Sequence, residues 1–224
     1  LLSRFASKIL LGVGNAFNGP KVESVGNPVR SEILALHSQE RSFEREDGKT
    51  RILVIGGSLG AVALNKAVPA ALEGFNENEV SVFHQCGKDR SEETAQLYKS
   101  VKCEFVTSDF VEDMASAYHN ADLIICRAGA STVSEVSAAK LPAIFVPLPT
   151  AVDDHQTKNA QSLVSVGAAK LLPQSELTSE ALHQLIVELR NPQTLKAMSE
   201  AAAKAAKLDA TTRVADIAEE LANK

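Results

Sequence analysis

The segment RILVIGGSLGAVALNKAV, residues 51–68, decides the fold of this chain. It runs from an apolar stretch through paired glycines into a segment whose apolar residues recur every three or four positions. The apolar stretch predicts a strand buried on both faces, and the periodic segment predicts a helix that packs on it. We therefore expect a strand–turn–helix unit with glycine at the corner.

The same unit recurs along the chain. Further strands, each expected to be buried on both faces, are predicted at 80–87, 103–108, 121–129, 141–149 and 168–174. Helices are predicted between the strands at 60–74, 90–101, 111–119, 131–139 and 155–166, and after them near 178–190, 192–207 and 209–222. This alternation predicts an α/β fold with a doubly wound, Rossmann-like parallel sheet.

Composition excludes several classes of protein. The chain has 224 residues, enough for a large core, and its net charge of -5 with scattered basic residues argues against nucleic acid as a partner. Three cysteines (Cys86, Cys103 and Cys126) lack metal-ligand spacing, which indicates a reducing, cytoplasmic compartment. No apolar run is long enough for a transmembrane helix or a signal sequence. Since the sequence begins without Met, we expect it to be part of a larger protein.

Ligands of open α/β sheets lie at the carboxyl ends of the strands, where helix N-termini attract anions. The first such corner here is GGSLGA, residues 56–61. Only two of the three glycines of a dinucleotide fingerprint fit, and no acidic residue ends the second strand, so NAD is disfavoured. The corner is either a ligand contact or a tight turn that needs glycine for close packing.

The second corner lies in IICRAGASTVSE, residues 124–135. Gly129 lets the backbone approach a phosphate, and Ser131 and Thr132 place hydroxyls beside free helix N–H groups, which suits a diphosphate. The alternative is a capping box in TVSE, with Glu135 reaching back to the backbone of Thr132. Both interpretations remain open at this point.

The third corner is AVDDHQTKNA, residues 151–160. Asp153, Asp154 and His155 are consecutive, and helix geometry splays them by about 100° each, so we expect no metal site. Asp153 is predicted to be the N-cap. His155, Gln156 and Asn159 would then face the strand ends and suit a neutral, hydroxyl-rich ligand; the alternative is a solvated helix start.

Four motifs in this order, GNPVR (26–30), GGSLGA, FVEDMASAYHNADLIICRAGASTVSE (110–135) and DDHQTKNA (153–160), resemble the donor-binding half of the bacterial MurG family. These N-acetylglucosaminyltransferases convert lipid I to lipid II in peptidoglycan synthesis. The resemblance covers essentially the whole chain. It implies the GT-B architecture, UDP-N-acetylglucosamine as the donor, inversion at the sugar, no cofactor, and a peripheral location on the cytoplasmic face of the inner membrane.

The resemblance also implies a set of donor-binding residues: Arg30, Ser58, Phe110, Val111, Met114, Ala130, Ser131, Thr132, Val133, Ser134, Glu135, His155, Gln156 and Asn159. Arg30 and Ser58 would lie at the diphosphate together with the helix start at 130–133. Glu135 would accept hydrogen bonds from the ribose.

The remaining members of this set would hold the two ends of the donor. The Phe110–Val111 corner, with Met114 behind it, would form the uracil pocket. Gln156, with His155 and Asn159, would hold the sugar hydroxyls. His155 departs from the family pattern, because some relatives have a second glutamine at this position.

Family members also carry a GGTGGH-type loop, the acceptor site for lipid I and the general base in an N-terminal domain, and this sequence contains no such loop. We expect residues 1–25 to be the end of that domain and the linker, 26–208 the donor domain, and 209–224 a helix that crosses back to the N-terminal domain. Apolar residues Val214, Ile217 and Leu221 of that helix would lack partners here. No catalytic residue is therefore expected in this chain.

Two other functions remain open. The chain could be the nucleotide-sugar-binding subunit of a split glycosyltransferase that pairs with a membrane-bound partner. It could also belong to a UDP-sugar epimerase, which would need acid and base residues in the cleft that the sequence does not provide.

Overall fold

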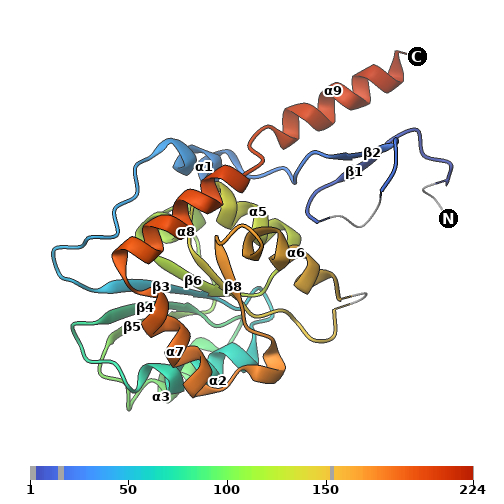
Figure 1. Ribbon diagram of the computed structural model, residues 1–224. Coiled ribbons are helices and arrows are strands. Elements are labelled where there is room, and N and C mark those ends of the chain that lie inside the picture. The colour runs from blue at the N-terminus through green and yellow to red at the C-terminus, as the bar shows by residue number, and fades with distance from the viewer. Residues whose placement is uncertain (1–3, 15–17, 152–153, 224) are drawn as a thin grey trace.

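A computed structural model describes residues 4–14, 18–151 and 154–223 (Figure 1). Its main body is a six-stranded sheet made of β3 (Thr50–Ile55), β4 (Val80–Gln85), β5 (Glu104–Ser108), β6 (Leu123–Cys126), β7 (Ala143–Phe145) and β8 (Ala169–Leu171). All pairs are parallel, and the spatial order is β5-β4-β3-β6-β7-β8. This is the strand order of a Rossmann-like doubly wound sheet, which confirms the predicted fold class.

Helices cover both faces of this sheet. The longer ones are α2 (Val62–Leu72), α5 (Ala130–Ala138), α6 (His155–Val164), α7 (Ser179–Leu189), α8 (Pro192–Ala205) and α9 (Ala210–Ala222). The shorter ones are α1 (Ser31–Leu34), η2 (Ala35–Ser38), α3 (Ser91–Leu97), α4 (Met114–Asn120) and η4 (Gln174–Glu176). Every helix predicted from the periodicity is present, and most are shorter than predicted at one or both ends.

The alternation of side chains along the strands builds two cores. Ile52 and Val54 of β3 face the layer of α2, α3 and α7, whereas Leu53 between them faces α4 and α5 on the other side. Helix α8 contributes to both cores, through Met198 to one and Ala202 to the other. The two layers hold the carboxyl ends of the strands in one row, where the predicted corners meet.

Strand β5 corrects one prediction. It lies at the edge of the sheet. Val106 is 57% exposed, and Glu104 on the same face is exposed too. Phe105, on the opposite face, stacks on Tyr98. The expectation that this strand is buried on both faces was wrong, because only one of its faces is covered by a helix. Apolar content alone does not distinguish an edge strand from a central one.

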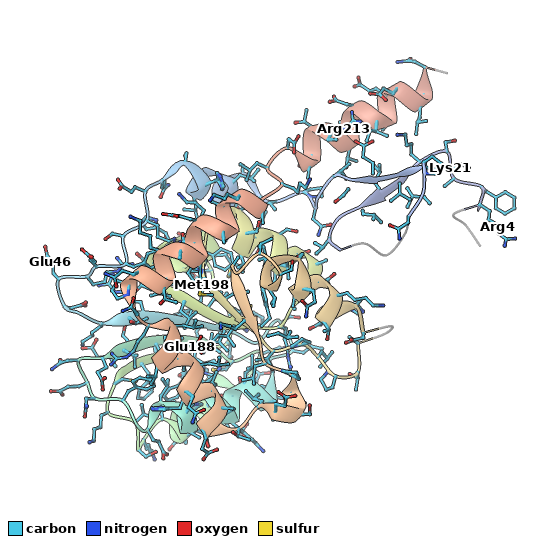
Figure 2. All side chains as sticks on the ribbon, viewed as in Figure 1. Arg4, Lys21, Glu46, Glu188, Met198 and Arg213 are labelled. Atoms are coloured by element: carbon cyan, nitrogen blue, oxygen red, sulfur yellow. The ribbon has the colours of Figure 1, made fainter. Side chains whose placement is uncertain are left out.

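The two ends of the chain lie together, away from the main body (Figure 1). Strands β1 (Ile9–Leu11) and β2 (Val22–Ser24) form a separate parallel pair, and α9 runs beside them. Arg213 of α9 donates to Glu23 of β2 at 2.6 Å (Figure 2). Ile217 is only 2% exposed, so the prediction that it lacks a partner was wrong; Leu221 is 37% exposed.

Candidate functional site

The site lies between β3 and β6, where the order of the strands in the sheet reverses. Strands β3 and β6 are neighbours in register from Ile52–Leu123 to Ile55–Cys126, but the chain leaves β3 towards α2 on one face and β6 towards α5 on the other. The glycine corner after β3 and the corner after β6 therefore lie side by side at the carboxyl edge. This topological switch point is where open α/β sheets bind ligands.

Helix α5 presents an open N-terminus at this point. Its N-cap is Gly129, which has no side chain to offer, and the first helical bond is donated by Val133 to the Gly129 carbonyl at 2.9 Å. The N–H groups of Ala130, Ser131 and Thr132 therefore have no acceptor inside the helix. Together with the helix dipole, these groups suit an anion.

Glu135 does not form the capping box. The helix begins at Ala130, so Thr132 is its third residue rather than its N-cap. The Glu135 carboxylate points instead to two other elements: Oε1 accepts from Arg30 Nε at 3.2 Å and Nη2 at 3.0 Å, and Oε2 accepts from the Tyr118 hydroxyl at 3.0 Å. The capping interpretation was wrong, and the ribose contact stays a prediction.

Arg30 and Glu135 form an asymmetric ion pair. The Arg30 side chain is 51% exposed and that of Glu135 is 16% exposed. Arg30 occupies the N-cap position of α1 and stands directly beside the α5 corner through its bonds to Glu135. A half-exposed guanidinium at this place is open to solvent. The diphosphate contact that the resemblance implies for Arg30 stays a prediction.

The glycine corner is held by a side chain that sequence reasoning did not select. Gln85, at the end of β4, accepts from the N–H groups of Gly56 at 3.1 Å and Gly57 at 3.0 Å. Its amide nitrogen donates to the carbonyls of Gly57 at 3.0 Å and Asp109 at 2.7 Å. Gln85 thus ties the turn that carries the exposed Ser58 to the corner that follows β5.

Close packing explains one glycine of this corner. Gly60 has a positive φ of 73°, and a Cβ placed there would lie 2.1 Å from the Cys86 carbonyl oxygen. The tight-turn interpretation therefore applies to Gly60. On the other side of the turn, Ser58 is exposed and its carbonyl accepts from the Lys88 N–H at 3.3 Å. The ligand contact of Ser58 stays a prediction.

The predicted uracil corner follows β5. The Ser108 hydroxyl donates to the Phe110 carbonyl at 2.7 Å, and the Phe110 ring is 50% exposed. Met114 packs against the core, and its place behind a uracil pocket stays a prediction. A mostly apolar cavity of about 320 Å³ lies between α4 and the sheet, and Val111 and Phe83 are among its lining residues. The corner thus offers an exposed ring and an apolar recess.

The preceding residue, Asp109, fixes the corner to the next helix. Its carboxylate accepts from the N–H groups of Asp89 and Arg90, each at 3.0 Å, and of Ser91 at 2.8 Å. Hydrogen bonding to the Ser91 backbone is the largest of the effects that lower the pKa of Asp109. Asp109 is therefore an ionised N-terminal cap for α3.

The third corner, at the start of α6, is hydrogen-bonded to the backbone of the second corner before α5. Gln156 Oε1 accepts from the N–H groups of Ala128 at 3.2 Å and Leu148 at 3.0 Å. Asn159 is 8% exposed and donates to the Ala128 carbonyl at 3.1 Å. The prediction that Asn159 faces the ligand is corrected: its amide is buried against the loop before α5. His155 is the exposed first residue of α6.

The start of α6 also differs from the prediction in its capping residue. Asp153 lies outside the described residues. Asp154 occupies the N-cap position with a positive φ of 53°, and its carboxylate accepts from the Thr157 hydroxyl at 2.7 Å. Among the described residues, no group of three His, Cys, Asp or Glu side chains could hold a metal ion.

Two further polar residues, Arg127 before α5 and Ser134 within it, form hydrogen bonds to other parts of the chain. Arg127 donates to the carbonyls of Val146 at 3.0 Å and Pro147 at 3.1 Å, and burial lowers its pKa. Ser134, predicted to contact the donor, accepts instead from Asn27 at 3.2 Å and donates to the Ala130 carbonyl at 3.0 Å. The structure thus places Ser134 on the side of α5 that faces the segment between β2 and α1.

The sequence contains a general signal for such residues. Gln85 and Arg127 are polar groups within otherwise apolar, buried segments, and such groups must find partners. The identity of the partner could not be read from the sequence, because each one lies on a different element.

Residues 51–221 match the C-terminal domain of glycosyltransferase family 28. The UDP-N-acetylglucosamine--N-acetylmuramyl-(pentapeptide) pyrophosphoryl-undecaprenol N-acetylglucosamine transferase of Alcanivorax borkumensis is 44% identical over 223 residues, covering 100% of this chain and 62% of that protein. The enzyme of the same name from Tolumonas auensis is 48% identical over 219 residues, covering 96% and 61%.

A solved structure agrees with these relatives. The crystal structure of Acinetobacter baumannii MurG matches with a TM-score of 0.87 and 42% identity, over 98% of this chain and 62% of that one. The chain therefore spans about 62% of the length of the proteins it matches. In the described part of the chain, no helix is both long enough and apolar enough to cross a membrane.

Proposed function

Because the chain belongs to glycosyltransferase family 28, we propose that it binds UDP-N-acetylglucosamine at the switch point between β3 and β6. It would serve as the donor half of an enzyme that forms lipid II from lipid I. The observation that carries this proposal is the uncapped N-terminus of α5 at the switch point, with Arg30 and Glu135 beside it. The names of the relatives supply the donor and the acceptor.

Each part of the donor has a matching group at the site. The N–H groups at the start of α5 and the half-exposed Arg30 guanidinium would hold the diphosphate. Glu135 would accept from the ribose hydroxyls, and the Phe110–Val111 corner would hold uracil. Gln156 and His155 lie at the start of α6, near enough to the α5 corner to favour contact with the sugar.

The reaction follows from this placement. A hydroxyl of the acceptor would attack the anomeric carbon from the face opposite the diphosphate, forming the new glycosidic bond as the carbon–oxygen bond to UDP breaks. The stereochemistry inverts, and a base of the acceptor half takes the hydroxyl proton. Arg30 and the α5 N-terminus would stabilise the negative charge that develops on the leaving diphosphate.

Binding of the acceptor is proposed for the other half of the enzyme, not for this chain. The relatives' acceptor is an undecaprenol derivative, so the enzyme would work at the inner membrane surface, on its cytoplasmic face, with the contact made by the acceptor half. If the acceptor half is instead a separate membrane-bound subunit, as in a split glycosyltransferase, the donor site proposed for this chain is the same. Membership of a transferase family favours transfer over epimerisation.

A transfer assay tests the proposal. The 224-residue chain, supplied with UDP-N-acetylglucosamine and a soluble lipid I analogue, should bind the donor without forming product. Adding the N-terminal half of a relative as a separate chain should restore transfer. Turnover by the homogeneous chain alone would contradict the half-enzyme proposal, and failure to bind the donor would contradict the donor site.

A further inference from the structure

The hydroxyl of Tyr118 makes one hydrogen bond to the described part of the chain. Tyr118 belongs to α4 and is only 1% exposed, so its ring is enclosed by the core. Its hydroxyl donates to Glu135 Oε2 at 3.0 Å. A buried hydroxyl without an acceptor is costly, so this bond fixes both side chains.

The two oxygens of the Glu135 carboxylate have partners of different kinds. Oε2 has the enclosed tyrosine, which has no room to move away. Oε1 has Arg30, whose side chain is 51% exposed. Ion pairs with an exposed partner are weak and exchange with solvent readily. One partner of the carboxylate is therefore permanent and the other can be replaced.

From this asymmetry we infer that Tyr118 is a positioning residue for nucleotide binding. It anchors Glu135 through Oε2, so that Oε1 can pass from Arg30 to the ribose hydroxyls when a nucleotide diphosphate draws Arg30 to its phosphates. The inference rests on the proposed function. It couples two ends of the ligand, because the diphosphate must engage Arg30 before the diol gains its acceptor.

The protonation state of the tyrosine suits this role. Burial, with the nearby charge of Glu135 as a smaller cause, raises the pKa of Tyr118 well above its ordinary value. The hydroxyl therefore keeps its proton at physiological pH and donates to the carboxylate. Its contribution to binding should not change between neutral and mildly alkaline solution.

The test compares two tyrosines. Tyr118→Phe removes only the hydroxyl oxygen that meets Glu135. Tyr98→Phe is the matched control: Tyr98 is equally enclosed, and its hydroxyl bonds to His84 Nδ1 at 2.8 Å, away from Glu135. Each variant and the wild type are titrated calorimetrically with UDP and with 2′,3′-dideoxy-UDP, which lacks both ribose hydroxyls.

We expect Tyr118→Phe to weaken UDP binding about tenfold and to leave binding of the dideoxy compound within about twofold of the wild type. Tyr98→Phe should lower stability and leave both affinities unchanged. Equal losses for the two ligands in Tyr118→Phe, or no loss for either, would overturn the inference while the donor site stands. A wild type that does not bind UDP would overturn the proposed function as well.

A second measurement covers the case in which Tyr118→Phe does not fold. In crystals of the wild type with UDP, the Tyr118 hydroxyl should remain within hydrogen-bond distance of Glu135, while Arg30 has left Oε1 for the phosphates. A Glu135 side chain that has turned away from Tyr118 to meet the ribose would contradict the positioning role.

Discussion

At the scale of the residue, Glu135 shows how one motif can support two roles. The letters TVSE fit a capping box, yet the helix starts three residues earlier than that motif requires. The carboxylate is consequently free to pair with Arg30 and Tyr118, which come from two other helices. The ligand interpretation therefore gains from the same geometry that excludes the cap.

Replacing Glu135 by Ala should weaken UDP binding by roughly ten- to a hundredfold, because a hydrogen bond to a charged acceptor contributes about 1.5–3 kcal/mol. Titration calorimetry measures this loss directly. Unfolding stability should fall by about 1–3 kcal/mol, since the buried Tyr118 hydroxyl loses its acceptor.

The control for Glu135 uses a ligand that lacks one hydroxyl. The compound 2′-deoxy-UDP should bind the wild type less well than UDP does, and should lose less on going to Glu135→Ala. The four affinities form a double-mutant cycle. Additive effects would show that the carboxylate and the hydroxyl do not interact.

The burial of His84 predicts how the stability of the fold depends on pH. It lies fully buried between Asn65 and Tyr98, and burial lowers its pKa to about 3. Asn65 donates its amide to the Cys86 carbonyl, so its oxygen accepts from Nε2, and Nδ1 accepts from the Tyr98 hydroxyl. His84 is therefore neutral in the folded protein.

In the unfolded chain this histidine titrates near its ordinary pKa of about 6.5. Below that pH the unfolded state binds a proton that the folded state does not, so stability falls by up to about 1.4 kcal/mol per pH unit, or about 2 kcal/mol at pH 5. The stability advantage of wild type over His84→Asn should shrink by this amount between pH 7.5 and pH 5 in urea unfolding. A difference that is independent of pH would contradict a neutral His84.

At the scale of the element, the glycine corner after β3 depends on backbone packing. Gly60 and Gly48 share a positive φ, of 73° and 67°, but only Gly60 has an atom in the path of a Cβ. Gly48→Ala should therefore cost only the backbone strain, about 1–2 kcal/mol. Gly60→Ala should cost several kcal/mol, because the Cys86 backbone must move. Equal losses in thermal or urea unfolding would refute the packing role.

The order and type of the six main strands and of helices α2 to α9 could be predicted, because each apolar run and each helical period is local. The short helices α1, η2 and η4 were not predicted. The burial of β5 could not, since an edge position depends on which strands pair. Val106 looks like any buried valine in the sequence, yet it is 57% exposed. Likewise Ile217 is only 2% exposed, and it belongs to α9, which runs beside β1 and β2 from the other end of the chain.

The positions of the three corners could be predicted from the sequence. The side chains that support these corners from neighbouring elements could not. Glycine, serine and acidic residues at strand ends mark where a ligand can approach, and Gly129 lies at such a corner as the N-cap of α5. Gln85 and Asn159 act by bonding to backbone groups of other corners. Such contacts join residues far apart in the sequence, so no local pattern reveals them.

At the scale of the whole molecule, we propose that this chain is a donor-binding unit for a uridine nucleotide sugar. A ligand that binds only the folded state raises the unfolding temperature, and at a hundred times its Kd it adds about 2.7 kcal/mol of stability. The direct measurement is thermal unfolding of the chain with millimolar UDP, UDP-N-acetylglucosamine or NAD. We predict a clear rise with both uridine compounds and none with NAD; protection by NAD equal to that by UDP, or no protection by UDP, would contradict the claim.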